Sequence, residues 1–294
     1  MAHHIDRRRD YRSQSAMEYL MTYGWAILII AVVLSVLFQL GVFSSGNFQP
    51  HAQAGSCQVS RTVAGVSLEG QCNGMLPQFV AQFNGASSYI SIPSINGLAS
   101  SAGQFNTVSF WVYINSLSLQ QIPVSFVDYD IWIESSTCIG LNTGNSDAYG
   151  FNPSGLQGKW INVVLVLNNG VYTNNALIYV NGVQQTIASC GSNGPVSQTV
   201  TAPLFLGQFN NGAPAGFYLS GQLANVQVYN VSLSSSEVQA LYLEGIGGAP
   251  IRPQNTVGWW PLNGNANDYS GNNNNGQLSS VTFSSSWESG YTAP

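Results

Sequence analysis

Three carboxylates and a tryptophan alternate along one short segment, Asp128-Tyr-Asp130-Ile-Trp132-Ile-Glu134. In an unbulged β-strand these four side chains share one face, because successive side chains point to opposite sides. Paired carboxyl groups are the acid and the base or nucleophile of glycoside hydrolysis, which needs them about 5–9.5 Å apart. At about 3.3 Å per residue, Asp130 lies about 13 Å from Glu134, and Asp128 about 20 Å from it. The spacing therefore favours a solvated strand face, or a loop before a strand, over a catalytic pair.

Histidine chemistry is excluded from most of the chain. His3 and His4 lie at the N-terminus, and His51 follows the first apolar segment, so the remaining 243 residues contain no histidine. A catalytic triad depends on a histidine base, and zinc sites usually include one. We therefore expect no enzyme active site of these kinds.

Two turn-like motifs could bind a small group. Asp268, Ser270 and Asn272 stand in a Gly- and Asn-rich stretch and could offer oxygen atoms to a structural Ca²⁺, the one cofactor considered. A turn rich in Asp and Asn is the alternative, and the single carboxylate favours it. Asn230 begins an Asn-Val-Ser motif, so it is a candidate for N-glycosylation.

The four cysteines are Cys57, Cys72, Cys138 and Cys190, and four cysteines allow three disulfide pairings. We favour Cys57–Cys72 with Cys138–Cys190, because the first pair brackets one local excursion of the chain. Zinc is the alternative, but the sequence has no Cys-x-x-Cys motif and no histidine near a cysteine.

The composition excludes a nucleic-acid-binding protein. Only 6% of the 294 residues are charged, with Lys and Arg numbering 7 and Asp and Glu 12, for a net charge of −5. The only basic residues after Arg12 are Arg61, Lys159 and Arg252, and they are scattered. Hydrophobic residues make up 45% of the chain, which is ample for a core.

The N-terminal region resembles a membrane-targeting segment. A basic leader, residues 1–13, precedes an uncharged stretch of 25 residues from Tyr19 to Phe43. A bilayer core needs about 20 apolar residues, so residues 14–45 are expected to form one long hydrophobic helix. The order of charge and apolar run predicts a cytoplasmic N-terminus, with all that follows outside the membrane. An outside location also favours disulfides.

The segment Gln14-Ser-Ala-Met-Glu18-Tyr-Leu20 resembles the processing site of archaeal type IV pilins, which carry a class III signal peptide. The resemblance implies that a prepilin peptidase cuts between Ser13 and Gln14, which leaves Glu18 as the fifth mature residue. Glu18 would then neutralise the new amine of its own or a neighbouring subunit in a filament core. Ser13 departs from the commoner glycine of this family, and a plain membrane anchor is the alternative.

After a linker, residues 46–75, the chain reads as a β-domain, residues 76–294. Short apolar or alternating runs are separated by turn residues, and an Asn181-Gly182 pair marks a hairpin. One helix is expected, with Ser234 as its N-cap, Glu237 completing a capping box and Gly245 ending it. These features predict an antiparallel jelly-roll sandwich.

Five pieces carry a second resemblance: FNGASSYISIP, FNTVSFWVYI, GKWINVVLVLNNG, LIYVNGVQQ and LANVQVYNVSLSSSEVQALY. In this order they resemble the laminin-G-like, concanavalin A-like jelly-roll family, which implies a lectin-like domain with glycans as a ligand class. The D-x-D-x-x-x-E spacing departs from the E-x-D-x-E patterns of glycosidases with related sandwiches.

The segment from Trp259 to Gly276 precedes the first strand in that family, but here it comes last. We interpret the domain as circularly permuted, which is tolerated where chain ends lie close together. The alternative is that the segment completes the sheet of a neighbouring subunit.

Together these features predict a subunit of a cell-surface pilus-like filament that displays a lectin-like domain for assembly and adhesion. Its expected partners are related pilin subunits, the prepilin peptidase, the membrane and glycans, with no nucleic acid. A membrane-anchored lectin that does not polymerise is the alternative, and a sandwich-fold glycoside hydrolase is a distant third.

Overall fold

The computed structural model describes residues 10–39, 76–118, 120–135, 137–143, 147–171, 176–191, 193–209 and 217–294. The chain divides into two compact units, one with the N-terminal helix and one with the β-domain. The predicted linker and the predicted Cys57–Cys72 disulfide lie outside the described residues.

The first unit contains helix α1, Asp10–Gln39, whose side chains are described from residue 21 to residue 36. All of these side chains are exposed, and the large apolar ones are Met21, Tyr23, Trp25, Ile27, Leu28, Ile29, Ile30, Val32, Val33, Leu34 and Val36. Among the residues that the structure describes, no helix combines the length and the apolar character needed to span a membrane. The roles expected of Ser13, Gln14 and Glu18 stay predictions.

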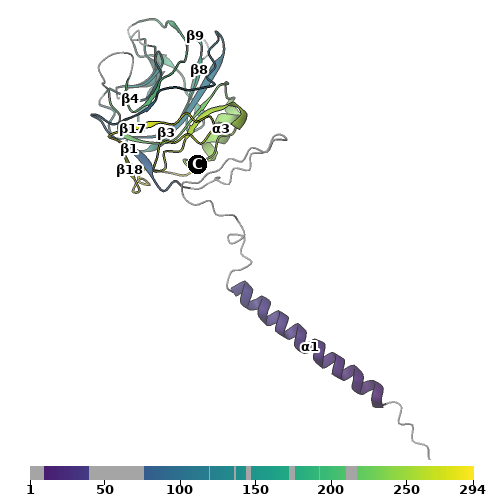
Figure 1. The fold of residues 1–294 in the computed structure, drawn as a ribbon. Coiled ribbons are helices and arrows are strands. Elements are labelled where there is room, and N and C mark those ends of the chain that lie inside the picture. The colour runs from purple at the N-terminus through teal and green to yellow at the C-terminus, as the bar shows by residue number, and fades with distance from the viewer. Residues whose placement is uncertain are drawn as a thin grey trace, which may run out of the picture. The chain divides into compact units, whose positions relative to one another are not determined.

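The second unit is built from two antiparallel sheets (Figure 1). Sheet A runs in the order β11-β10-β8-β3-β15-β1-β18, and β16 also pairs with β15. Its strands are β1 (Val80–Asn84), β3 (Phe105–Ile114), β8 (Trp160–Asn168), β10 (Leu177–Val180), β11 (Val183–Gln184), β15 (Ser220–Tyr229), β16 (Thr256–Trp260) and β18 (Thr282–Ser284).

Sheet B runs in the order β12-β7-β6-β5-β4-β14-β2-β17. Its strands are β2 (Tyr89–Ile92), β4 (Gln121–Ser125), β5 (Asp130–Ser135), β6 (Cys138–Asn142), β7 (Tyr149–Phe151), β12 (Ala188–Ser189), β14 (Leu204–Leu206) and β17 (Gln277–Ser279). A small separate ribbon pairs β9 (Gly170–Val171) with β13 (Ser197–Gln198). The predicted antiparallel sandwich is therefore confirmed.

The main core lies between the two sheets, and each strand gives alternate side chains to it. In β8, Val163 and Leu165 belong to this core, whereas Val164 and Val166 lie in a second cluster on the other face. Strand β8 is thus buried on both faces, which explains why it reads as a continuous apolar run.

Helix α3, Ser235–Leu243, covers the second face of β8 (Figure 1). Its Val238 and Leu241 share a buried cluster with Val164 and Val166. The predicted capping box is present, because the Ser234 hydroxyl accepts from the Glu237 backbone N–H and the Glu237 carboxylate accepts from the Ser234 N–H. The short 3-10 helix η2, Pro253–Asn255, follows before β16.

The C-terminal segment is built into this chain's own sheets. Strand β16 pairs with β15, β17 with β2 and β18 with β1, so the segment adds strands to both sheets. This arrangement is the one that circular permutation of the domain requires.

Candidate functional site

The face of sheet B that points away from the core carries the carboxylate and tryptophan side chains of the candidate site. Ile131 and Ile133 of β5 enter the core, so Asp130 and Trp132, which alternate with them, point to the opposite side. We call this side the outer face of sheet B. Asp130 and Trp132 share the predicted strand face, but a register irregularity between Ile133 and Ser135 interrupts the alternation at Glu134, and Asp128 precedes the strand.

A pocket of about 370 Å³ opens on this outer face. It is lined by Glu134, Thr137, Cys138, Gly150, Phe151, Asn152, Thr186, Ala188, Ser189 and Cys190. Its size falls in the range of small-molecule sites, about 300–1,000 Å³. Carboxylate, hydroxyl and amide groups line it together with apolar surface, so it could accept a polar ligand.

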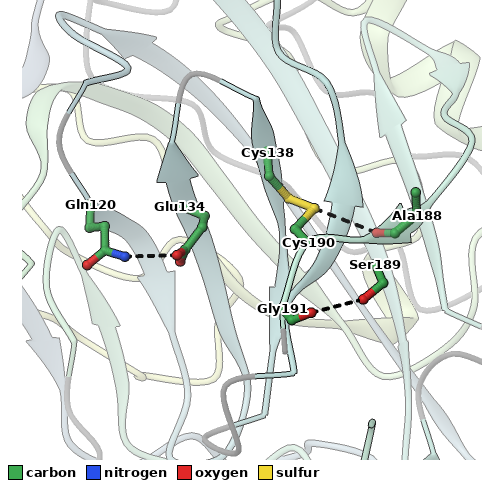
Figure 2. The surroundings of a disulfide bond; sticks show 7 residues. All are labelled: Gln120, Glu134, Cys138, Ala188, Ser189, Cys190 and Gly191. Atoms are coloured by element: carbon green, nitrogen blue, oxygen red, sulfur yellow. Dashed lines mark hydrogen bonds between the residues drawn. A yellow bond between two sulfur atoms is a disulfide. The ribbon is translucent and has the colours of Figure 1, made fainter. Parts of the chain in front are cut away.

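A disulfide between Cys138 and Cys190 forms part of the pocket wall (Figure 2). This is the pairing that we favoured from the sequence, and its Cα atoms lie 6.3 Å apart. Cys190 follows β12, an exposed edge strand of two residues, and the bond ties the end of that strand to β6. The disulfide thus fixes a wall that few backbone hydrogen bonds hold in place.

Glu134 lines the pocket, two residues after Trp132. Figure 2 shows its carboxylate directed toward Gln120, from whose side-chain amide it accepts a hydrogen bond of 2.9 Å. A carboxylate held in this way still has free lone pairs, so it can accept further hydrogen bonds from ligand hydroxyls.

Three aromatic side chains cluster on the same face. The Trp132 ring lies 6.1 Å from that of Phe209 and 5.1 Å from that of Phe217, measured between ring centroids. Phe217 is 39% exposed, and it adopts a positive φ of 55°, which is uncommon for a bulky residue. The Trp132 indole N–H is buried without a hydrogen-bond partner. We call these three residues the aromatic cluster.

Asp130 is buried rather than solvated, so the expectation of a solvated strand face is wrong for this residue. It is 1% exposed, and neither carboxylate oxygen has a hydrogen-bond partner among the residues that the structure describes. Burial, and to a smaller extent the negative charge of Asp128, raises its pKa from 3.8 to about 8. Its cross-strand neighbours, Ser125 and Asn142, are neutral, so no cation offsets the cost of ionising it.

Comparison with known proteins shows the superfamily to which the chain belongs. The model of the concanavalin A-like lectin/glucanases superfamily, Laminin_G_3, matches residues 84–239. The chain belongs to this superfamily. The match spans all of β5 to β14 and therefore contains Trp132, Glu134 and both cysteines of the disulfide. Among curated proteins, none matches the chain.

One solved structure supports the sandwich fold, and two others are similar over part of the chain. A candidate carbohydrate-binding protein from Bacteroides ovatus aligns with a TM-score of 0.51 at 14% identity, over 70% of this chain and 59% of that one. The chain thus spans less than two thirds of that protein. A SAP-like pentraxin from Limulus polyphemus aligns with a TM-score of 0.42 at 15% identity, over 56% of this chain and 81% of that one.

Domain 4 of a GH43 extracellular arabinanase from Geobacillus stearothermophilus aligns with a TM-score of 0.36 at 24% identity, over 55% of this chain and 76% of that domain. At these identities the likeness concerns the fold. Ligand chemistry has to be argued from the residues of this chain.

The structure does not bring the carboxylates together as a catalytic pair. Strand β5 begins at Asp130, and Glu134 lies four residues further along the same strand. Asp130 is enclosed, whereas Glu134 borders the pocket. In a superfamily that includes glucanases, this separation argues against hydrolysis by these residues.

The carboxylate of the candidate calcium site accepts hydrogen bonds from its own turn. Asp268 accepts hydrogen bonds from the backbone N–H groups of Trp259, Ser270 and Asn274, and from the Ser270 hydroxyl. The Asn272 amide donates to the carbonyl oxygens of residues 256 and 257. Within the described ranges, no three His, Cys, Asp or Glu side chains form a metal-binding group. Calcium binding here stays a prediction.

The candidate glycosylation site is similarly engaged. The Asn230 side-chain amide donates to the Gly97 carbonyl oxygen, and its carbonyl accepts from Asn255. Glycosylation of Asn230 stays a prediction that would require these contacts to break.

Sequence reasoning missed the pocket, Gln120 and two members of the aromatic cluster. Phe209 and Phe217 lie 77 and 85 residues after Trp132, and no periodic pattern connects them with it. They meet Trp132 only because the chain between β14 and β15 returns to the outer face of sheet B.

Proposed function

We propose that the sandwich binds carbohydrate on the outer face of sheet B. The observation that carries the proposal is the pocket, which has the Glu134 carboxylate in its lining, together with the aromatic cluster around Trp132 of the same strand. Sugars combine apolar C–H faces, which pack against aromatic rings, with hydroxyl groups that donate to carboxylates. Membership in a superfamily of lectins and glucanases supports this ligand class.

Binding of the full chain to an immobilised panel of glycans tests the proposal. Trp132→Ala should weaken binding of the best ligand about tenfold, which corresponds to about 1.4 kcal/mol. Val183→Ala, an exposed position on the edge strand β11, is the matched control and should bind like the wild type. If no glycan binds, or if Trp132→Ala binds normally, the site is not a carbohydrate site.

The positions of the carboxyl groups on this face support binding rather than hydrolysis. A glycoside hydrolase would need a second carboxyl group within about 9.5 Å of Glu134 and open to substrate. Asp130 is on the same strand but is enclosed. Hydrolysis of a bound glycan, lost in the Asp130→Asn, Glu134→Gln double variant, would instead favour an enzyme.

We propose further that α1 assembles this domain into a filament at the cell surface. The support is that the described part of α1 exposes large apolar side chains around its whole circumference. A helix that is apolar on every side is stable where other helices or lipid surround it. In the precursor, the basic leader would keep the N-terminus in the cytoplasm, and the prepilin peptidase would release Gln14 as the first residue.

The N-terminal mass of the protein isolated from its cells tests this route. A chain that begins at Gln14 supports pilin-type processing, and retention of Met1 to Ser13 supports the membrane-anchored lectin. In processed protein, Glu18→Ala should impair filament formation seen by electron microscopy, while Glu18→Asp should retain part of it. Normal filaments from Glu18→Ala would remove the proposed pairing with the free amine.

A further inference from the structure

We infer that the pocket beside the disulfide binds a sugar that carries a free primary amine, and that the Glu134 carboxylate is the partner of its ammonium group. This inference rests on the proposed function and names the chemical class of its ligand. The alternative within the same function is a pocket that holds a sugar without charge.

The pocket is buried at its base and open to solvent at its rim. Cys138 of β6 and Gly150 and Phe151 of β7 are buried, so they form the base. The exposed lining residues are Thr137, Asn152, Thr186, Ala188 and Ser189. A volume of about 370 Å³ is at the small end of the range for ligand sites, so the pocket suits a single sugar better than a long chain.

Glu134 is a half-buried carboxylate without a cationic partner. The hydrogen bond of 2.9 Å that it accepts comes from the neutral amide of Gln120. The β-domain has two basic residues, Lys159 and Arg252. Arg252 pairs with Glu237 of α3, and Lys159 directly precedes β8 of sheet A. In the described part of the chain, therefore, no ion pair offsets the charge that a carboxylate brings to this pocket.

A ligand ammonium group supplies the missing opposite charge. It has three N–H donors and no acceptor, and the Glu134 carboxylate has lone pairs beyond the one that Gln120 uses. A sugar hydroxyl can also donate to Glu134, but it adds no attraction between opposite charges. A ligand carboxylate or sulfate would be repelled. The charge at this site therefore favours an amine over a hydroxyl and a hydroxyl over an acid.

The rest of the lining indicates that the amine belongs to a sugar rather than to a lysine side chain. The Thr186 and Ser189 hydroxyls and the Asn152 amide can both donate and accept hydrogen bonds, as sugar hydroxyls do. A lysine side chain has only methylene groups behind its amine, so it would give these groups no partner. The Cys138–Cys190 disulfide adds an apolar wall on which the C–H groups of a sugar ring can pack.

Ligand-observed NMR titration of the full chain with single sugars tests the inference. The probes are the methyl glycosides of glucosamine, N-acetylglucosamine, glucose and glucuronic acid, with the matching galactose series, so that ring shape and charge vary separately. In the series that binds, the amino sugar should bind about tenfold more tightly than the neutral sugars, and the acidic sugar most weakly. The preference should shrink as the salt concentration rises from about 0.05 M to about 0.5 M.

A matched pair of variants locates the charge that causes the preference. Glu134→Gln keeps the shape of the side chain, so it should remove the preference for the amino sugar and change the affinity for neutral sugars by at most about threefold. Glu288→Gln removes the same charge at an exposed position after β18 and should keep the preference. The pair separates a local effect from the attraction of any cation to a chain with a net charge of −5. Thermal unfolding checks that both variants are folded.

The possible outcomes separate the two proposals. Neutral sugars that bind as tightly as the amino sugar, or a preference that survives Glu134→Gln, overturn this inference but leave carbohydrate binding intact. Tighter binding of N-acetyl-lysine methylamide than of the amino sugars overturns the sugar ligand in favour of a lysine side chain. Failure of every sugar to bind removes carbohydrate binding, and this inference with it.

Discussion

The two outer faces of this sandwich have opposite characters. On sheet A, the C-terminal segment covers Trp111 and Trp160 with Trp287 and Tyr291, and the three tryptophans are buried. On sheet B, Trp132 is half-buried near an open pocket, and Phe217 is partly exposed to solvent. The outer face of sheet A is thus closed by the C-terminal segment, whereas the outer face of sheet B is closed at Asp130 but has an open pocket near Glu134.

The indole N–H groups show the same difference. Trp160 donates to the carbonyl oxygen of Trp287, and Trp287 donates to that of Pro77. Trp259, on the same side, donates to Asn225. The buried indole N–H of Trp132 has no partner. Because an unpaired buried donor costs about 1–3 kcal/mol, groups of this kind persist where a ligand or another function uses them.

The largest expected effect comes from removing the cover of sheet A. Deletion of residues 259–294 removes β17, β18, the end of β16 and Trp287, so it should abolish folding of the sandwich. The whole free energy of unfolding, about 5–15 kcal/mol for a typical domain, is then lost. Circular dichroism and size-exclusion chromatography of the truncated chain measure this outcome.

A folded, monomeric truncated chain would contradict this expectation. It would mean that the segment belongs to a neighbouring subunit's sheet, and the interpretation as a permuted domain would fail. If the truncated chain is unfolded, residues 259–294 can be added to it as a separate peptide. Folding restored by the peptide would show that this segment completes the truncated sandwich.

The difference between the faces also explains what the sequence could reveal. Trp160–Leu167 is apolar at nearly every position, and Ser234 with Glu237 has capping-box spacing, so both elements follow from local rules. Asp130 stands in an alternating pattern that is typical of a half-solvated strand, yet it is enclosed. Alternation shows which side chains share a strand face, but it carries no information about what covers that face.

The next effect concerns the buried carboxyl group of sheet B. Asp130 has a raised pKa, so the folded state holds its proton between pH 3.8 and about pH 8, where the unfolded chain has lost it. The contribution of this protonated carboxyl group to the free energy of unfolding is complete below pH 3.8 and is lost as the pH rises to about 8. The free energy of unfolding should fall by about 1.4 kcal/mol per pH unit in this window, about 6 kcal/mol in all.

Asp130→Asn removes this titration while nearly keeping the volume of the side chain. Urea unfolding at pH 4, 6 and 8 should show that the variant loses the slope and is more stable than the wild type at pH 8. Asp128→Asn is the control, and it should flatten the slope only slightly, because burial is the larger cause of the shift. A wild type whose stability rises from pH 4 to pH 8 contradicts this account.

A matched pair of tryptophan substitutions compares the two faces directly. Trp287→Ala should destabilise the domain by about 3–5 kcal/mol, because it empties a fully buried site and leaves the Trp160 side uncovered. Trp132→Ala should cost less, about 1–2 kcal/mol, since part of its surface is already in water. Glycan binding should show the reverse order, when the two variants are compared under conditions where both are folded. Equal loss of stability would mean that the outer face of sheet B is as closed as that of sheet A.

The smallest expected effects come from one hydrogen bond on each face. Ser234→Ala removes the N-cap of α3, so it should lower stability by about 1 kcal/mol and leave glycan affinity unchanged.

Gln120→Ala removes the amide that holds Glu134. Because Gln120 is exposed, stability should stay within about 0.5 kcal/mol of the wild type. Its glycan affinity should fall by a few-fold, since Glu134 loses its fixed orientation at the edge of the pocket. Denaturant unfolding and calorimetry on the two variants measure both quantities. If Gln120→Ala lowers stability and leaves affinity unchanged, the hydrogen bond to Glu134 is structural and the two faces differ less than we infer.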